Sequence, residues 1–319
     1  MLLCLERKKL NKKISLVVPC FNEEESIPLF YKEVEKVKSK LRGYELEYLF
    51  INDGSKDKTL EVLKKLQKEH EEDIHYISFS RNFGKESALY AGLKEATGDF
   101  IAVMDVDLQD PPELLVPMLA GIEDENYDIV GTRRADRKGE PVIRSFFSNL
   151  FYKLINRISN TEFISGIRDY RLMTRQVVDA ILKMSEYNRF SKGIFSWVGF
   201  NAKYLEYSNR DRAAGKTSWS FWSLFKYSLQ GIINFSETPL YIASYIGLGS
   251  FLISLLAIIF IICRKLFYGG SVNGWASMIT IILFLGGIQL FCLGILGRYI
   301  GGIYLESKKR PLYIIKEKK

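Results

Sequence analysis

Two aspartates separated by a single residue follow an apolar run near residue 100. Asp105 and Asp107 come directly after Phe100 to Met104, and Gln109 follows two residues later. Side chains two apart in an extended backbone point the same way, so a strand ending here directs both carboxylates into one crevice. Paired carboxylates repel, and a hard divalent ion such as Mg²⁺ or Mn²⁺, shared with substrate phosphate oxygens, would neutralise them. An acidic turn after a buried strand is the alternative reading, and the neighbouring motifs must decide.

The part of the chain before residue 132 alternates strand-like apolar runs with helical patterns. Strands are predicted over 14–18, 46–52, 74–79, 100–104 and 128–131, and helices over 24–41, 59–68, 85–96 and 113–122. Strands that alternate with helices predict an α/β domain with a doubly wound, Rossmann-like, mostly parallel sheet. Ligands of such sheets bind beyond the carboxyl ends of the strands.

A polar cluster follows each of the first four predicted strands. In chain order the clusters are PCFNEE (19–24), NDGSKDKT (52–59), RNFGKE (81–86) and DVDLQDPPE (105–113). Taken alone, Asp53 begins an ordinary turn and Asp57 is an ordinary helix cap. Because all four clusters fall at strand ends, together they predict a single site at one edge of the sheet.

In this order the four clusters resemble the family-2 glycosyltransferases, nucleotide-sugar enzymes of the GT-A fold. Further segments resemble the subgroup that glycosylates polyprenyl phosphates, which includes bactoprenol glucosyltransferases and dolichol-phosphate mannose synthases. These segments are GTR (131–133), RDYRLM (168–173), RFSKG (189–193), RAAGKT (212–217) and LGRYIG (296–301). The resemblance covers about residues 14 to 315. It departs from the family pattern at Asn52, where an acid is usual, and at Ser218, where a basic residue is usual.

The resemblance implies roles for individual residues. Asp107 and Gln109 are the expected metal ligands, and Asp105 contacts the ribose or the metal. The expected nucleotide-sugar contacts are Pro19, Phe21, Glu23, Asp53, Lys85 and Asp105. The expected catalytic set is Asp105, Asp107, Asp169, Arg212 and Lys216, with Lys216 standing in for the basic residue missing at 218. Arg133, Arg144 and Ser148 match positions that bind the acceptor phosphate.

The implied reaction is an inverting transfer of a hexose to undecaprenyl or another polyprenyl phosphate, with UDP-glucose as the default donor. A carboxylate such as Asp53 or Glu23 can accept the uracil N–H. A divalent ion stabilises the charge that develops on the diphosphate leaving group. The acceptor phosphate is already ionised at neutral pH, so positioning rather than general-base help dominates.

Two long stretches near the C-terminus carry no charge. Leu240 to Cys263 has 24 residues and Trp275 to Gly297 has 23. Each would extend for about 35 Å as a helix, enough to cross a bilayer, although two buried core helices are an alternative. Basic residues concentrate after the second stretch, so the positive-inside rule predicts that the catalytic domain and both termini lie in the cytoplasm. The resemblance to bactoprenol enzymes implies that the membrane is the bacterial plasma membrane.

These signals divide the chain into seven parts. They are an N-terminal tail (1–13), a GT-A catalytic domain (14–218), an amphipathic interfacial helix with linker (219–239), a first transmembrane helix (240–263), an external loop (264–274), a second transmembrane helix (275–297) and a basic cytoplasmic tail (298–319). A second aromatic-rich amphipathic helix is predicted over 144–158. Such helices lie at membrane surfaces, or else simply cover the sheet.

The composition agrees with a membrane-bound enzyme. A net charge of +8 suits a domain lying against an anionic leaflet, and no nucleic-acid motif is present. The four cysteines have no paired spacing and indicate reduced structural thiols. Expected partners are the nucleotide sugar, the polyprenyl phosphate, the bilayer, a flippase for the product and further copies of the chain.

Two other functions compete with this one. A processive polysaccharide synthase of the same fold usually carries a Q-x-x-R-W motif and more spans, neither of which occurs in this sequence. A non-catalytic nucleotide-sugar binder would not need Asp105, Asp107 and Gln109 intact. A polyprenyl-phosphate glycosyltransferase is therefore the favoured prediction.

Overall fold

The computed structural model describes residues 12–134, 151–159, 161–207, 221–268 and 274–319. In this part of the chain, eight strands form one sheet with the order β7-β5-β6-β4-β1-β2-β3-β8. The strands are β1 (Lys12–Cys20), β2 (Tyr44–Asn52), β3 (Ile74–Phe79), β4 (Phe100–Val103), β5 (Ile129–Arg134), β6 (Ile167–Thr174), β7 (Ala202–Tyr207) and β8 (Ile315–Lys318). All five strands predicted from the sequence are present, as β1 to β5.

The sheet is mostly parallel but mixed. β1 pairs in parallel with β2 and β4, β2 with β3, and β5 with β7. β6 runs antiparallel to both of its neighbours, β4 and β5, and β8 runs antiparallel to β3. The carboxyl ends of the other six strands therefore share one edge with the amino end of β6, where Asp169 lies.

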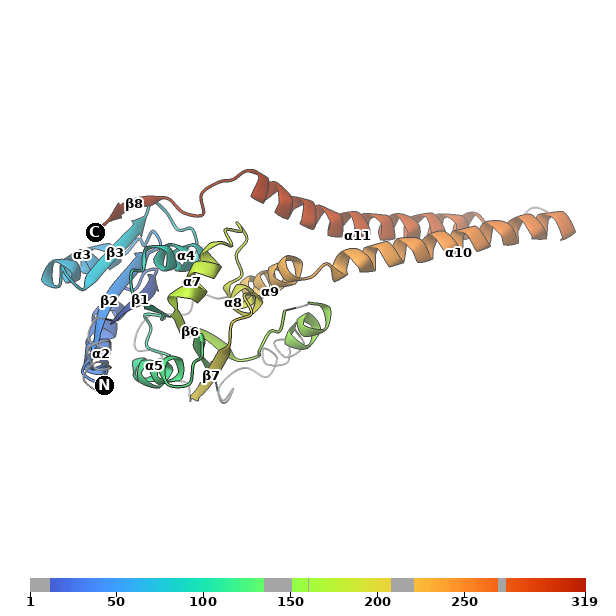
Figure 1. Cartoon of the computed structure of the whole chain (residues 1–319). Helices are drawn as coiled ribbons and strands as arrows, with labels where there is room; N and C mark the ends of the chain where they lie inside the picture. Colours follow the sequence, from blue (N-terminus) through green and yellow to red (C-terminus); the bar gives the residue numbers. More distant parts are fainter. Residues whose placement is uncertain (1–11, 135–150, 160, 208–220, 269–273) are drawn as a thin grey trace.

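Helices cover both faces of the sheet (Figure 1). They are α2 (Ser26–Lys38), α3 (Thr59–Glu69), α4 (Lys85–Glu95), α5 (Leu115–Glu123), α7 (Arg175–Leu182) and α8 (Ser191–Trp197), with a short 3₁₀ turn, η1 (Pro112–Leu114), before α5. Successive side chains of β1 point to opposite faces of the sheet and so enter two separate hydrophobic cores. Leu16 and Val18 pack with α2, α3 and α5, while Val17 packs with α4, α7 and α8. α4 approaches the sheet closely through Gly92, where a Cβ atom would lie 2.3 Å from Val17.

Two long helices extend away from the sheet domain (Figure 1). After α9 (Phe221–Phe235), the chain forms α10 (Thr238–Tyr268) and α11 (Trp275–Ser307), which lie side by side. The segments Thr238–Arg264 and Met278–Ser307 are long and apolar enough to cross a membrane, and large side chains such as Leu283 and Phe260 are exposed along them. Such continuous apolar surface needs an apolar environment.

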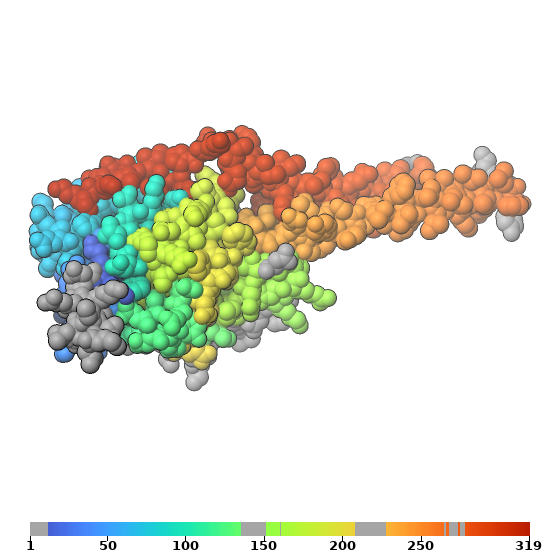
Figure 2. Space-filling view, in the orientation of Figure 1, coloured from blue at the N-terminus to red at the C-terminus, as the bar shows by residue number. Residues whose placement is uncertain are grey.

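The last residues of the chain return to the sheet. Beyond α11 the backbone runs across the surface of the domain, drawn in red in Figure 2, and ends as β8 beside β3. The sequence predicts only a basic tail here, because Ile315–Lys318 reads IKEK and has no hydrophobic alternation. The edge of β3 nevertheless offers unpaired backbone groups, and a short charged strand is a suitable partner for them.

Candidate active site

The loops after β1, β2, β3 and β4 meet at one edge of the sheet, and each contains a residue in the left-handed region. These are Asn22 (φ 56°), Gly54 (φ 64°), Gly84 (φ 97°) and Leu108 (φ 58°). Glycine is required at position 54 for a second reason, because a Cβ atom there would lie 2.2 Å from the backbone carbon of Arg81. For Leu108, between Asp107 and Gln109, the conformation costs on the order of 1–3 kcal/mol, and such strain gathers at functional sites.

Asp53 is buried in the loop after β2, and two backbone amides hold its carboxylate. The N–H of Phe83 donates to Oδ1 at 2.6 Å, and the N–H of Gly84 donates to Oδ2 at 2.9 Å. Burial raises the pKa of the Asp53 carboxyl, and these two hydrogen bonds offset the effect only in part. Each oxygen keeps a second lone pair for a ligand. Asp53, which is predicted to contact the nucleotide, therefore joins the loop after β2 to the loop after β3.

Asn52 occupies the position where the resembling family usually has an acid. Its side-chain amide donates to Ser78 Oγ at 3.0 Å, and its Oδ1 accepts the N–H of Ser55 at 3.1 Å. An ionised carboxylate could not donate the first of these bonds. In this chain Asn52 links β2 to β3, and Asp53 remains the predicted nucleotide contact.

The loop after β1 carries the other predicted contacts to the base. Glu23 Oε2 accepts the hydroxyl of Ser26 at 2.6 Å, and the Glu23 N–H donates to Thr59 Oγ1 at 2.8 Å. Phe21 is 39% exposed, so its ring is available as a wall for a planar ligand. Pro19 lies one residue before the end of β1, beside Ile51 of β2. The structure thus gathers Pro19, Phe21 and Glu23 on one side of Asp53.

Lys85, the first residue of α4, joins two carboxylates from distant parts of the sequence. Its Nζ lies 2.7 Å from Asp105 Oδ1 and 2.5 Å from Asp169 Oδ2. The two acidic side chains are 27% and 21% exposed, so the cluster is open to a ligand on one side. Three residues predicted separately from motifs after β3, after β4 and at the start of β6 therefore form one group.

Charge attraction fixes the protonation states in this cluster. Burial would raise the pKa of the Asp169 carboxyl, but attraction by Lys85 and Lys192 outweighs burial and holds the pKa well below its usual range. Burial would likewise lower the pKa of the Lys85 ammonium, but Asp105 and Asp169 raise it above its ordinary value. At neutral pH Asp169 is consequently an ionised hydrogen-bond acceptor, and it is unsuited to donate a proton.

Asp107 and Gln109 lie on one tight turn. The N–H of Gln109 donates to Asp107 Oδ1 at 3.1 Å, and the Asp107 side chain is largely buried. Their carboxylate and amide oxygens are hard donors that suit Mg²⁺ or Mn²⁺. No group of three or more His, Cys, Asp or Glu side chains in the described residues could hold a metal by itself. A metal here would take its remaining ligands from the substrate diphosphate and water.

Arg168 binds two residues of the same turn, a role that was not predicted from the sequence. Its guanidinium donates to Gln109 Oε1 at 3.1 Å and pairs with Asp110 Oδ1 at 3.2 Å. The Tyr207 hydroxyl donates to the same Asp110 oxygen. Burial raises the pKa of the Asp110 carboxyl despite Arg168. The signal available in the sequence was the RDYRLM motif, which gives no indication that Arg168 reaches back to the D-x-D turn.

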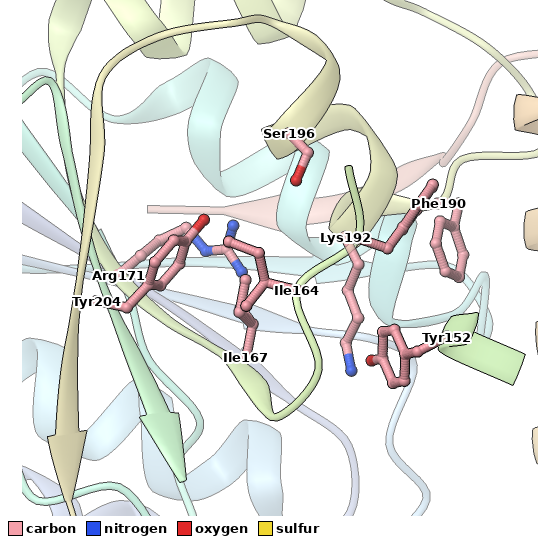
Figure 3. Close-up of a pocket in the computed structure, with 9 residues that line it drawn as sticks. Tyr152, Ile164, Ile167, Arg171, Phe190, Lys192, Ser196 and Tyr204 are labelled. Atoms are coloured by element: carbon pink, nitrogen blue, oxygen red, sulfur yellow. The ribbon is translucent and has the colours of Figure 1, made fainter. Parts of the chain in front are cut away.

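A small pocket lies between Arg171 of β6 and Lys192 of α8 (Figure 3). Arg171 lies beside Tyr204 with its guanidinium 3.7 Å from the ring centroid of Phe195, while Lys192 points toward Tyr152. The other lining residues are Ile164, Ile167, Phe163, Phe190 and Ser196. The pocket therefore combines two cations with mostly apolar and phenolic side chains.

The predicted acceptor residues are described only in part. Arg133 is exposed near the end of β5, and its side chain passes close to Gly166 in the segment before β6. It lies opposite Ile167, which also lines the pocket of Figure 3. Arg144, Ser148, Arg212 and Lys216 lie outside the described residues.

Comparison with known proteins identifies the family. Residues 15–182 match Glycosyl transferase family 2. A prophage bactoprenol glucosyl transferase homolog of Escherichia coli is 46% identical over 96% of this chain and 99% of its own length. The bactoprenol glucosyl transferase of Shigella phage SfX is also 46% identical, over 96% of this chain and all of its own.

One similar solved structure is that of glucosyl-3-phosphoglycerate synthase from Mycobacterium tuberculosis in complex with Mn²⁺, UDP-glucose and phosphoglyceric acid. The match covers 72% of this chain and 80% of that chain at 20% identity, with a TM-score of 0.47. The family assignment does not use this structural match. It rests on the family match over residues 15–182 and on relatives that align along nearly the whole chain. The protein belongs to glycosyl transferase family 2 and is a glycosyltransferase.

Proposed function

We propose that the protein transfers glucose from UDP-glucose to a polyprenyl phosphate, with inversion at the anomeric carbon. The observation that carries the proposal is the acidic edge built from Asp105, Asp107 and Asp169, on a domain that continues into two long apolar helices. Relatives named bactoprenol glucosyl transferase align across both parts and support the same acceptor class. A processive synthase or a non-catalytic binder explains fewer of these features.

The donor is proposed to lie across the loops after β1, β2 and β4. Glu23 and Asp53 would accept hydrogen bonds from the base, with Pro19 and Phe21 beside it. Asp107 and Gln109 would hold Mg²⁺ or Mn²⁺, which when bound supplies positive charge to the diphosphate leaving group. Asp169, kept ionised by Lys85, would accept hydrogen bonds from sugar hydroxyls and so orient the ring.

The acceptor is proposed to enter from the side of Arg133 and the pocket of Figure 3. Arg133, Arg144 and Ser148 would bind its phosphate, and Arg212 and Lys216 would hold donor or acceptor phosphates. Arginine suits this role because its planar fork can donate two hydrogen bonds to one phosphate. The phosphate oxygen attacks as an anion, so the residues need to align it and exclude water rather than remove a proton.

The proposed location is the bacterial plasma membrane, with the catalytic domain and both termini in the cytoplasm. The pairing of β8 with β3 supports this arrangement, because two crossings by α10 and α11 would return the C-terminus to the side of the catalytic sheet. Basic residues follow α11, which favours the cytoplasmic side. The lipid-linked product would form on that side, and a partner flippase would carry it across.

The proposed reaction is tested by lipid labelling. Membranes containing the protein are incubated with undecaprenyl phosphate and a panel of radiolabelled sugar nucleotides, and the lipid phase is extracted. We expect label from UDP-glucose to enter the lipid phase, and membranes carrying Asp107→Ala serve as the control. Label from a different sugar nucleotide alone would overturn the donor, and no lipid label from any donor would overturn the acceptor class.

Donor and acceptor recognition should respond to different substitutions. Arg133→Ala is expected to raise the KM for polyprenyl phosphate about 10- to 150-fold, the range for one charge-assisted contact of roughly 1.5–3 kcal/mol. UDP affinity measured by calorimetry should stay near the wild-type value. Asp53→Ala should weaken UDP binding and leave the acceptor KM nearly unchanged. Lys203→Ala, which removes a surface cation paired with Glu125, is the matched control. Equal loss of UDP affinity in Arg133→Ala and Asp53→Ala would assign Arg133 to the donor diphosphate.

The proposed orientation is tested with single cysteines in a variant that lacks the four native ones. Ser271→Cys, in the predicted external segment 264–274, should react with a membrane-impermeant thiol reagent applied to intact cells. Lys316→Cys, on exposed β8, should react only after the cells are permeabilised. The opposite pattern would put the active site outside the cell, away from the cytoplasmic pool of sugar nucleotides.

A further inference from the structure

The segment that follows α11 is fastened to the domain along the outer side of β3. The Ser80 N–H donates to the carbonyl of Ile314 at 3.0 Å, and Tyr76 and Lys319 exchange backbone hydrogen bonds of 2.9 and 3.0 Å. Ion pairs join Lys64 to Glu317 at 2.7 Å and Lys318 to Glu95 at 3.1 Å. The tail is thus bonded to β3, α3 and α4 rather than resting against one of them.

Tyr313, just before β8, begins a series of ring contacts that leads into the site. Its half-buried ring stacks on Phe79 with centroids 4.9 Å apart and planes at 15°. Phe79, the last residue of β3, meets Phe83 edge to face at 5.8 Å and 89°. Both geometries are favoured for aromatic pairs, so each ring restricts where the next can lie.

The series ends at the loop that holds Asp53. Phe83 and Gly84 supply the two backbone N–H groups that bind its carboxylate. Gly84 has a φ of 97°, and α4 starts at the next residue, Lys85. The Phe83 ring and both amides belong to one short turn, so the contact of this ring with Phe79 restrains the backbone that presents the amides to Asp53.

We propose that Tyr313 is a positioning residue for nucleotide binding. It holds Phe79 and Phe83, and through them it sets the turn that orients Asp53. The tail beyond the second apolar helix is then part of the donor site, although it touches no substrate. This inference rests on the proposed function, in which Asp53 contacts the base of the nucleotide.

The test compares four variants of the full chain, purified in detergent. Tyr313→Ala removes the ring, Tyr313→Leu keeps apolar bulk, Tyr313→Phe keeps the stack, and Ile314→Ala trims an exposed neighbour while keeping its backbone acceptor. Binding of UDP in the presence of Mg²⁺ is measured by calorimetry. We expect Tyr313→Ala and Tyr313→Leu to bind UDP about fivefold more weakly, within the range for loss of one aromatic pair. Tyr313→Phe and Ile314→Ala should stay within about twofold of the wild type.

A kinetic measurement separates positioning from general loosening. In Tyr313→Leu the KM for the sugar nucleotide should rise about fivefold, while the KM for polyprenyl phosphate stays constant. Unchanged UDP affinity in both Tyr313→Ala and Tyr313→Leu, or an equal rise in the two KM values, would overturn the inference.

Asp53→Ala, measured in parallel, distinguishes a failure of the role of Tyr313 from a failure of the proposed donor site. If it weakens UDP binding and the Tyr313 variants do not, only the role of Tyr313 is wrong. If Asp53→Ala itself leaves UDP binding unchanged, the proposed donor site is wrong, and the role of Tyr313 falls with it.

Discussion

Asp107→Ala is expected to lower kcat by at least about 100-fold, the scale seen when one key charge stabiliser is lost at a developing anion. Asp107 is largely buried on the turn that also carries Gln109, and Leu108 between them is held in a left-handed conformation. Asp107 and Gln109 are the two side chains proposed to hold the metal, so alanine removes one of the two proposed protein ligands. Initial rates of lipid-linked glucose formation measure the effect.

Metal removal provides the companion measurement. Excess EDTA should abolish transfer by the wild-type protein, and added Mg²⁺ or Mn²⁺ should restore it, but the same additions should not rescue Asp107→Ala. Asp124→Ala, an exposed acid at the end of α5, is the control for loss of a negative charge. Undiminished transfer in excess EDTA would show that Asp107 acts without a metal.

Lys85→Met should also reduce kcat by at least about 100-fold, comparable with removal of an electrostatic stabiliser. The lysine bridges Asp105 and Asp169, so the carboxylate oxygens it contacts cannot lie more than about 5 Å apart. Methionine keeps the length of the side chain and removes the charge, which leaves two like charges facing each other. Rates measured at neutral pH should show the loss.

The pH profile of Lys85→Met gives a second, signed readout. Attraction by Lys85 lowers the pKa of Asp169 against the opposing effect of burial. Without the ammonium, burial and repulsion by Asp105 both favour the protonated acid, so the acidic limb of the kcat profile should move to higher pH. Lys94→Met, on the exposed side of the same helix, should leave the profile unchanged. A loss of rate with an unmoved acidic limb would mean that Lys85 contributes charge to the donor but does not keep Asp169 ionised.

The strands that carry the site were predictable, because their signals are local. The runs that became β1 to β4 are apolar, each ends in a polar cluster, and parallel strands bring such ends to one edge. The contact between Lys85 and Asp169 was not predictable from either residue. It depends on β6 running against β4, which places Asp169, at the start of its strand, opposite the end of β4. No local pattern around residue 169 encodes that direction.

Other parts of the site escaped prediction for different physical reasons. Arg168 had no predicted role, yet it donates to Gln109 and pairs with buried Asp110, a tertiary contact over about 60 residues of sequence. Asn52 departs from the family pattern, and the structure explains it by a hydrogen bond to Ser78 that needs a donor. β8 was missed because its charged residues carry no hydrophobic signal, and only the open edge of β3 gives them a role.

The pairing of β3 with β8 also sets the order in which the protein can be assembled. β3 is synthesised long before β8, and α10 and α11 lie between them in the chain. A nascent chain therefore carries an uncovered edge of β3 until the residues that follow both apolar helices have been synthesised. Exposed edges recruit other strands and promote aggregation. In the proposed topology, a chain that inserts only one helix would leave its last strand on the wrong side of the membrane, so completion of the sheet would depend on insertion of both helices.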